Sequence, residues 1–141
     1  MVRDREREAL MAEVGLFRDL PRAQLKRLAL VSREVSHPAG KEIAAEGLGG
    51  LAFHVILEGS AKVSKDGREL RTLGPRDYFG EISMIDGKPR SATVTAVEPL
   101  KALAIPHVDF DQVVDEDPTF ARYLLKTLCA RLRDAEARSV G

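Results

Sequence analysis

Residues 79–96 read FGEISMIDGKPRSATVTA, and this stretch is the most informative in the sequence. It begins with a glycine and an acid, turns through Asp-Gly-Lys-Pro, and ends in Arg-Ser before an alternating β-branched segment. Residues 81–85 can form one or two helical turns, and Gly87 then ends them in the left-handed conformation. Gly80 lets other backbone or a ligand approach closely. The stretch therefore predicts a short helix between two extended segments, with room for a ligand at its start.

The polar residues of this stretch suit a cyclic phosphate joined to a sugar. Backbone amides at the start of the short helix favour an anion. Arg90 offers a rigid fork that matches a phosphate better than a lysine does, and Ser91 adds a hydroxyl donor. Glu81 would repel a phosphate but accepts a hydrogen bond from a sugar hydroxyl. A nucleotide whose phosphate closes a 3′,5′ ring leaves its 2′-hydroxyl free beside that phosphate, so both charges fit one small ligand.

The rest of the chain places this stretch inside a strand-rich segment between helical ends. Residues 1–33 predict two amphipathic helices, the second with Pro21 in its first turn and its end near Val31. Residues 34–106 predict short antiparallel strands with a turn about every 8–12 residues. The predicted strands centre on Val35, on Ile43, on 53–57, on 61–63, on 70–73 and on two segments of 92–106. Turns are predicted at 46–50 and, as a hairpin, at 65–67.

Two helices follow in residues 107–138, separated just before Pro118. The predicted fold is mostly β: an antiparallel, jelly-roll-like β-roll with N-terminal helices and two C-terminal helices, in one domain over residues 1–141. The last helix carries an apolar stripe, which needs a partner surface. The stripe consists of Phe120, Leu124, Leu128, Leu132 and Ala135.

Composition narrows the class of protein. The 141 residues suffice for one domain, and 22 basic residues balance 22 acidic ones, without the basic surplus typical of a DNA-binding domain. No apolar run approaches the roughly 18 residues of a membrane span, and the charged N-terminus does not resemble a secretory signal. Cys129 is the single cysteine, so neither a disulfide framework nor a thiolate metal cluster is expected. We expect a cytoplasmic domain without membrane association.

The stretch FGEISMIDGKPRSATV resembles the phosphate-binding cassette of cyclic nucleotide-binding domains. This family includes the bacterial catabolite activator protein, the regulatory subunits of cAMP-dependent kinase and the nucleotide-gated channels. The resemblance continues in GLFRDLP (15–21), HPAGKEIAAEG (37–47) and FHVILEGSAKV (53–63), and in the C-terminal helices. It implies a cassette over residues 79–94 within a roll over 34–106.

The resemblance also implies a role for each site residue. Glu81 would bind the ribose hydroxyl, and Arg90 would bind the cyclic phosphate. The other residues implied to line the ligand are Gly80, Ile82, Ser83, Ser91 and Ala92 around the phosphate, with Val63 and Leu70 as an apolar wall beside the base.

The base itself is less clear from the residues. Ser91 is compatible with either purine, and the base-reading positions of the bacterial activator fall on Ala135 and Glu136. The side chain of Ala135 cannot form a hydrogen bond, and Glu136 could accept one or remain solvated. The prediction favours cAMP over cGMP, because cAMP is the commoner bacterial ligand.

Two other functions compete with this interpretation. A metal-dependent cupin-like enzyme needs a His-x-His pair near an acid, but His37, His54 and His107 are scattered. We therefore predict no catalytic set, no metal and no cofactor besides the nucleotide. The second alternative is the ligand-binding fragment of a longer Crp/Fnr-type transcription regulator. The helix-turn-helix domain of such regulators would begin near Gly141, so no direct DNA binding by that route is expected of these residues.

The predicted mechanism is a binding switch. The ligand would draw Glu81 and Arg90 together and tighten the cassette, and the last helix, hinged near 117–118, would then move. That helix would close as a lid, pair in a homodimer or meet an effector protein, and the sequence leaves these alternatives open.

Overall fold

The computed structural model describes residues 2–44, 47, 52–89 and 91–140. Arg90 and most of the predicted turn at 46–50 lie outside these residues. Within them the helices are α1 (Asp4–Ala12), α2 (Arg22–Val31), α3 (Glu81–Asp86), α4 (His107–Glu116) and α5 (Pro118–Val140). The strands are β1 (Arg33–His37), β2 (Glu42–Ala44), β3 (Ala52–Glu58), β4 (Ala61–Lys65), β5 (Arg68–Leu73), β6 (Tyr78–Phe79), β7 (Thr93–Ala96) and β8 (Leu100–Pro106).

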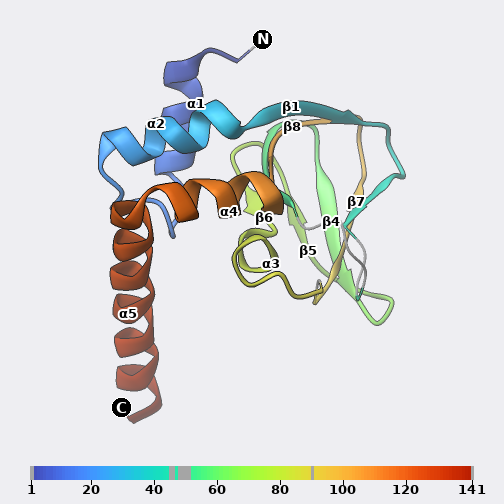
Figure 1. Ribbon diagram of the computed structural model, residues 1–141. Coiled ribbons are helices and arrows are strands. Elements are labelled where there is room, and N and C mark those ends of the chain that lie inside the picture. Colours follow the sequence, from blue (N-terminus) through green and yellow to red (C-terminus); the bar gives the residue numbers. More distant parts are fainter. Residues whose placement is uncertain (1, 45–46, 48–51, 90, 141) are drawn as a thin grey trace. The chain divides into compact units, whose positions relative to one another are not determined.

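The strands form two four-stranded antiparallel sheets. One has the order β1-β8-β3-β6 and the other the order β2-β7-β4-β5. The short helix α3 contacts β3 and is drawn below β6 in Figure 1. The predicted antiparallel roll is therefore confirmed, and both the hairpin of β4 and β5 and the helix ended by Gly87 are present.

The core of the roll consists of small and medium apolar side chains from both sheets. Alternate residues are buried there, Ala61 and Val63 on β4 and Val94 and Ala96 on β7, as the period of two in a strand requires. The buried cluster comprises Ala44, Ile56, Ala61, Val63, Leu73, Phe79, Val94, Ala96, Leu100 and Ala102. Phe79 belongs to this core and also begins the cassette, so the cassette is anchored by burial at its first residue.

A tight turn between β3 and β4 requires glycine. Gly59 has a φ of +89°, a region that L residues rarely adopt. A Cβ at this position would overlap the carbonyl oxygen of Pro99 and lie 3.0 Å from the Cα of Leu100. The turn therefore lies directly against the backbone that enters β8.

The chain divides into two compact units. One is built around Val31–Asp111 and contains the roll, α3 and the start of α4. The other combines Arg3–Leu30 with the chain from Gln112 onward. Polar contacts join α2 to the junction of α4 and α5 in this helical unit. Arg27 lies 2.7 Å from Glu116, and Gln24 donates to Asp117 at 3.2 Å.

Asp117 forms the break between α4 and α5. Its carboxylate accepts a hydrogen bond from the backbone amide of Phe120 at 3.3 Å, as an N-cap residue does. The hydrogen bond from Gln24, with smaller contributions from the Phe120 amide and Arg27, holds the pKa of Asp117 below its usual value. The predicted break before Pro118 therefore coincides with a capped helix start.

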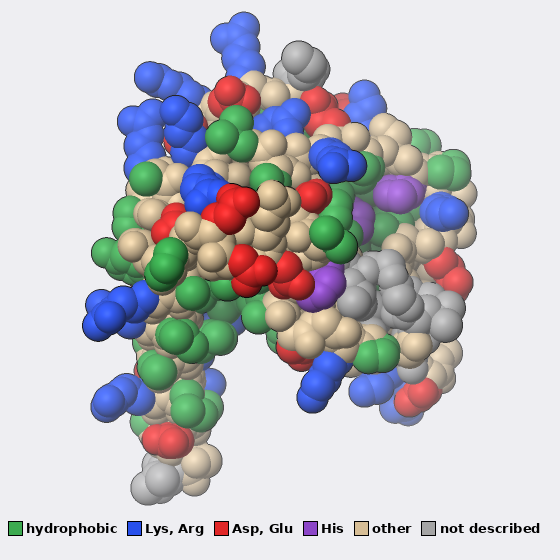
Figure 2. Space-filling view, in the orientation of Figure 1, with side chains coloured by type: hydrophobic (Ala, Val, Ile, Leu, Met, Phe, Trp, Pro, Cys, Tyr) green, Lys and Arg blue, Asp and Glu red, His purple; other side chains and the backbone are tan. Residues whose placement is uncertain are grey.

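Only the first part of the predicted stripe on α5 is buried. Phe120 and Leu124 are buried, whereas Leu128 and Leu132 are 40% and 61% exposed. Figure 2 shows hydrophobic side chains in green along α5, with blue Lys and Arg side chains beside them. Cys129 is exposed on the same helix. Among the described residues, no helix is long and apolar enough to span a membrane.

Candidate functional site

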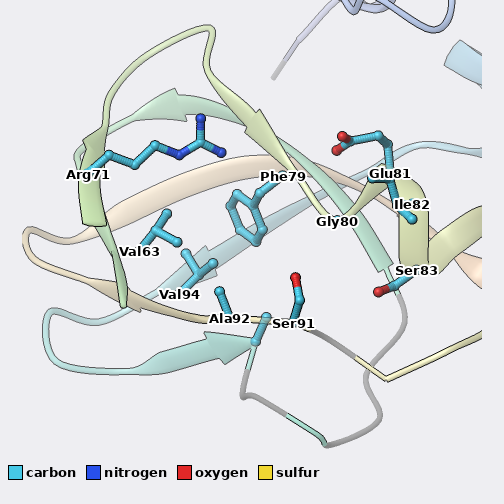
Figure 3. A pocket seen from close by; sticks show the side chains of 11 residues that line it. Val63, Arg71, Phe79, Gly80, Glu81, Ile82, Ser83, Ser91, Ala92 and Val94 are labelled. Atoms are coloured by element: carbon cyan, nitrogen blue, oxygen red, sulfur yellow. The ribbon is translucent and has the colours of Figure 1, made fainter. Parts of the chain in front are cut away.

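A cavity of about 200 Å³ opens beside the N-terminal end of α3. Its walls come from β2, β4, β5, β6, β7 and the cassette. Figure 3 shows Glu81 and Ser83 on one side of it, and Arg71 and Val63 on the other. The residues that line it are Ala44, Val63, Arg71, Phe79, Gly80, Glu81, Ile82, Ser83, Ser91, Ala92 and Val94.

Gly80 sets the direction in which α3 leaves the sheet. It precedes the helix with a φ of +89°, and its carbonyl accepts the hydrogen bond from the amide of Met84 at 3.0 Å. A side chain would be strained in this left-handed conformation. The turn places Glu81 in the first helical position, at the edge of the cavity, and Ser83, 8% exposed, beside it.

Two charged side chains of opposite sign face the cavity. In Figure 3 the carboxylate of Glu81 and the guanidinium of Arg71 point toward each other from opposite sides. Neither group forms a hydrogen bond or ion pair with another of the described side chains or backbone groups. Charges of both signs around one small cavity suit a ligand with its own donors and acceptors.

Apolar side chains also line the cavity. Val63 and Val94 lie between Arg71 and Ala92 in Figure 3, with the Phe79 ring beside them. Phe79 is 6% exposed and stacks on the ring of His54, with 4.8 Å between centroids and an angle of 8°. This rigid apolar wall suits the flat face of a base.

Most of the predicted site residues line this one cavity. They are Val63, Gly80, Glu81, Ile82, Ser83, Ser91 and Ala92. Arg90 lies outside the described residues. Leu70 is absent from the lining and is 58% exposed on β5.

A bulge explains why Arg71 faces the cavity. After the turn, Ser64 pairs with Glu69, but Val63 pairs with Arg71, so Leu70 is an extra residue on β5. An unbroken hairpin would have placed Leu70 opposite Val63. Sequence reasoning missed Arg71 for this reason, and it also missed Ala44, Phe79 and Val94 as cavity residues. Alternation along β7 was the available signal for Val94.

Within the described part of the chain, no group of three or more His, Cys, Asp or Glu side chains could hold a metal ion. His37 and His54 lie with ring centroids 6.1 Å apart, and burial, together with nearby Lys41, lowers the pKa of His37.

The cavity offers carboxylate, hydroxyl, guanidinium and apolar groups to a ligand.

The model of the family described as cyclic nucleotide-binding domain matches residues 34–117. The chain belongs to this family. The match covers the roll, the cassette and α4, and it confirms the resemblance on which the site residues were predicted.

Relatives of this cyclic nucleotide-binding domain have different outputs. The chain is 29% identical over 131 residues to a CRP-like cAMP-activated global transcriptional regulator of Mycobacterium tuberculosis, covering 89% of the chain and 58% of the relative. It is 34% identical over 122 residues to a cyclic nucleotide-gated potassium channel of Mesorhizobium japonicum, and this match covers 86% of the chain and 34% of the channel. The chain thus spans just under three fifths of the length of the regulator and about one third of the length of the channel.

A solved structure agrees with this domain over nearly its whole length. The N-terminal domain of a transcriptional regulator from Streptomyces coelicolor superposes with a TM-score of 0.79 and 34% identity, covering 92% of this chain and 93% of that one.

Proposed function

We propose that the domain is a sensor that binds a cyclic purine nucleotide in the cavity beside α3. The observation that carries this proposal is the carboxylate of Glu81, which faces the cavity without a partner among the described residues. The Glu81 carboxylate accepts a hydrogen bond from the ribose 2′-hydroxyl, and Arg90 and Ser91 bind the cyclic phosphate. Val63 and Val94 pack against the base.

Calorimetric titration tests this function directly. The domain is titrated with cAMP and cGMP, and with 5′-AMP as a control whose phosphate is not cyclised. We expect micromolar or tighter binding of a cyclic nucleotide, much weaker binding of 5′-AMP, and recovery of the nucleotide unchanged, as for a sensor rather than an enzyme. No heat from either cyclic nucleotide would refute the proposal.

Two observations favour different purines. The predicted preference for cAMP is supported by the name of the M. tuberculosis relative, a cAMP-activated regulator. Arg71 favours cGMP instead, because it lies at the far end of the cavity from Ser83, beside the wall that would pack on the base (Figure 3). An arginine fork matches the O6 and N7 acceptors of guanine, whereas adenine presents a donor at the corresponding position. cGMP is therefore the second candidate ligand.

Replacing Arg71 by alanine distinguishes these candidates. If Arg71 binds the guanine edge, cGMP binding should weaken by about 5- to 150-fold, since a bidentate pair contributes about 1–3 kcal/mol. Binding of cAMP should change little. The Arg68→Ala variant is the matched control, because Arg68 is exposed on the same strand and does not line the cavity. An unchanged ratio of the two dissociation constants in Arg71→Ala would exclude base reading by Arg71.

Movement of α4 and α5 is the output that we propose. The break at Asp117 supplies a hinge, and the exposed leucines of α5 supply a surface that a ligand-dependent partner can cover. Through that surface, α5 closes over the cavity as a lid, pairs with a second copy of the chain or binds an effector protein. A transcription regulator and a channel among the relatives support a sensor domain that can control different kinds of effector.

A further inference from the structure

One histidine joins the cassette to the helix after the roll. His107 is the first residue of α4, and its side chain is 28% exposed. Its Nδ1 lies 2.6 Å from the backbone carbonyl oxygen of Met84 in α3. Its Nε2 lies 3.1 Å from a carboxylate oxygen of Asp111, one turn further along α4. A single imidazole therefore bridges α3 and α4.

The contact with Met84 completes the end of α3. The last carbonyls of a helix lack intrahelical partners. Here the carbonyl of Ser83 accepts from the amide of Gly87 at 2.9 Å, and that of Met84 faces His107. A Cβ on Gly87 would lie 3.5 Å from the Cε1 atom of His107, so the ring lies directly against the helix end. Because α3 has only six residues, its cavity end and its His107 end belong to one rigid piece.

The two partners of His107 constrain its protonation. A backbone carbonyl and a carboxylate are both acceptors, so each ring nitrogen must donate. A neutral imidazole has one N–H, and only the imidazolium satisfies both contacts. Of the other charged groups nearby, Asp86 accepts a hydrogen bond from the Lys88 amide, and Asp109 pairs with Arg33 on the roll. The negative end of α3 also favours a cation at this position.

We propose that His107, as the imidazolium, is a positioning residue that holds α3 in its ligand-binding position and links nucleotide affinity to proton binding. The inference rests on the proposed function, since α3 carries Glu81 and Ser83 into the cavity. Loss of one proton leaves a single N–H for two acceptors. The charged Asp111 carboxylate is the stronger acceptor, so the remaining proton stays on Nε2, Nδ1 then faces the Met84 carbonyl as a second acceptor, and the contact between α3 and α4 is lost. By linkage, bound nucleotide favours the protonated ring as much as the protonated ring favours nucleotide.

The experiment combines affinity with a direct reading of the ring. Dissociation constants for cAMP and cGMP are measured from pH 6 to pH 8.5 in the wild type and in His107→Phe, which keeps a ring but has no donor. We expect wild-type affinity to fall by about fivefold or more as pH rises. The Phe variant should bind weakly at all pH values, without that pH dependence. Long-range ¹H–¹⁵N spectra should show the His107 ring keeping both protons to higher pH with nucleotide bound than without.

Two histidine controls identify the source of any pH effect. His54 stacks on the cavity residue Phe79, and His37 lies beside His54. The His37→Gln and His54→Gln variants should retain the pH dependence of the wild type. A pH dependence that survives in His107→Phe, or nucleotide binding that is independent of pH in the wild type, would overturn this inference alone. Absence of nucleotide binding at every pH would overturn the proposed function as well.

Discussion

Nucleotide binding should be nearly abolished when Arg90 is replaced by alanine. The variant would leave the cyclic phosphate without its charged partner, and loss of one member of a charge pair of this kind costs about 2–5 kcal/mol. The dissociation constant should therefore rise by about 30- to 4,000-fold. Calorimetric titration measures the change, and circular dichroism verifies that the variant is folded. Tight binding in a folded Arg90→Ala variant would show that the phosphate lies elsewhere.

The Glu81→Gln variant should weaken binding by less, about 10- to 150-fold. It keeps the size of the side chain but replaces the charged acceptor by a neutral amide, whose NH2 group can turn toward the hydroxyl. A hydrogen bond to a charged group contributes about 1.5–3 kcal/mol. Glu42→Gln is the matched control, because Glu42 is exposed on β2 and does not line the cavity. Because the proposed partner is the 2′-hydroxyl, 2′-deoxy-cAMP should bind the wild type weakly and should lose little further affinity in Glu81→Gln. If Glu81→Gln lost the same affinity for cAMP and for 2′-deoxy-cAMP, Glu81 would not bind the ribose 2′-hydroxyl.

The largest effect on stability should come from Gly59→Ala. A Cβ at this position both adopts a strained φ and overlaps the Pro99 carbonyl oxygen, which belongs to backbone and cannot rotate away. Strain of this type costs about 1–3 kcal/mol, and overpacking adds a similar amount. We expect the melting temperature of the domain to fall by about 10 °C or more, as measured by calorimetry.

The Gly67→Ala variant separates the two causes. Gly67 has a similar φ of +77° in the turn between β4 and β5, but a Cβ there would meet no atom within 4 Å. It should therefore lose only the strain contribution, about 1–2 kcal/mol. If both variants lost the same stability, the overlap of a Cβ at residue 59 with the Pro99 carbonyl would not contribute to the destabilisation.

Sequence reasoning performed best where structure depends on neighbouring residues. The helix after Gly80, its end at Gly87 and the break at Asp117 each follow from local backbone preferences, and each is present. The strand β6 was missed because two residues are too short a segment to show a period.

Longer-range features escaped prediction for a different physical reason. The turn at 65–67 was predicted, but the bulge after it depends on how β5 packs against the rest of the roll. That single extra residue replaces Leu70 by Arg71 at the cavity wall and so changes an apolar contact into a charged one. The contact of His107 with Met84 joins residues 23 positions apart, and no local pattern indicates it.

The exposed Cys129 makes movement of α5 directly observable. It is the single thiol in the chain, so a maleimide fluorophore or a nitroxide would label one defined position without any substitution. The spectrum of such a label during addition of nucleotide would report on the helix itself, whereas calorimetry reports on the cavity. The unaltered sequence thus carries its own attachment point for a probe that can record the signal in real time.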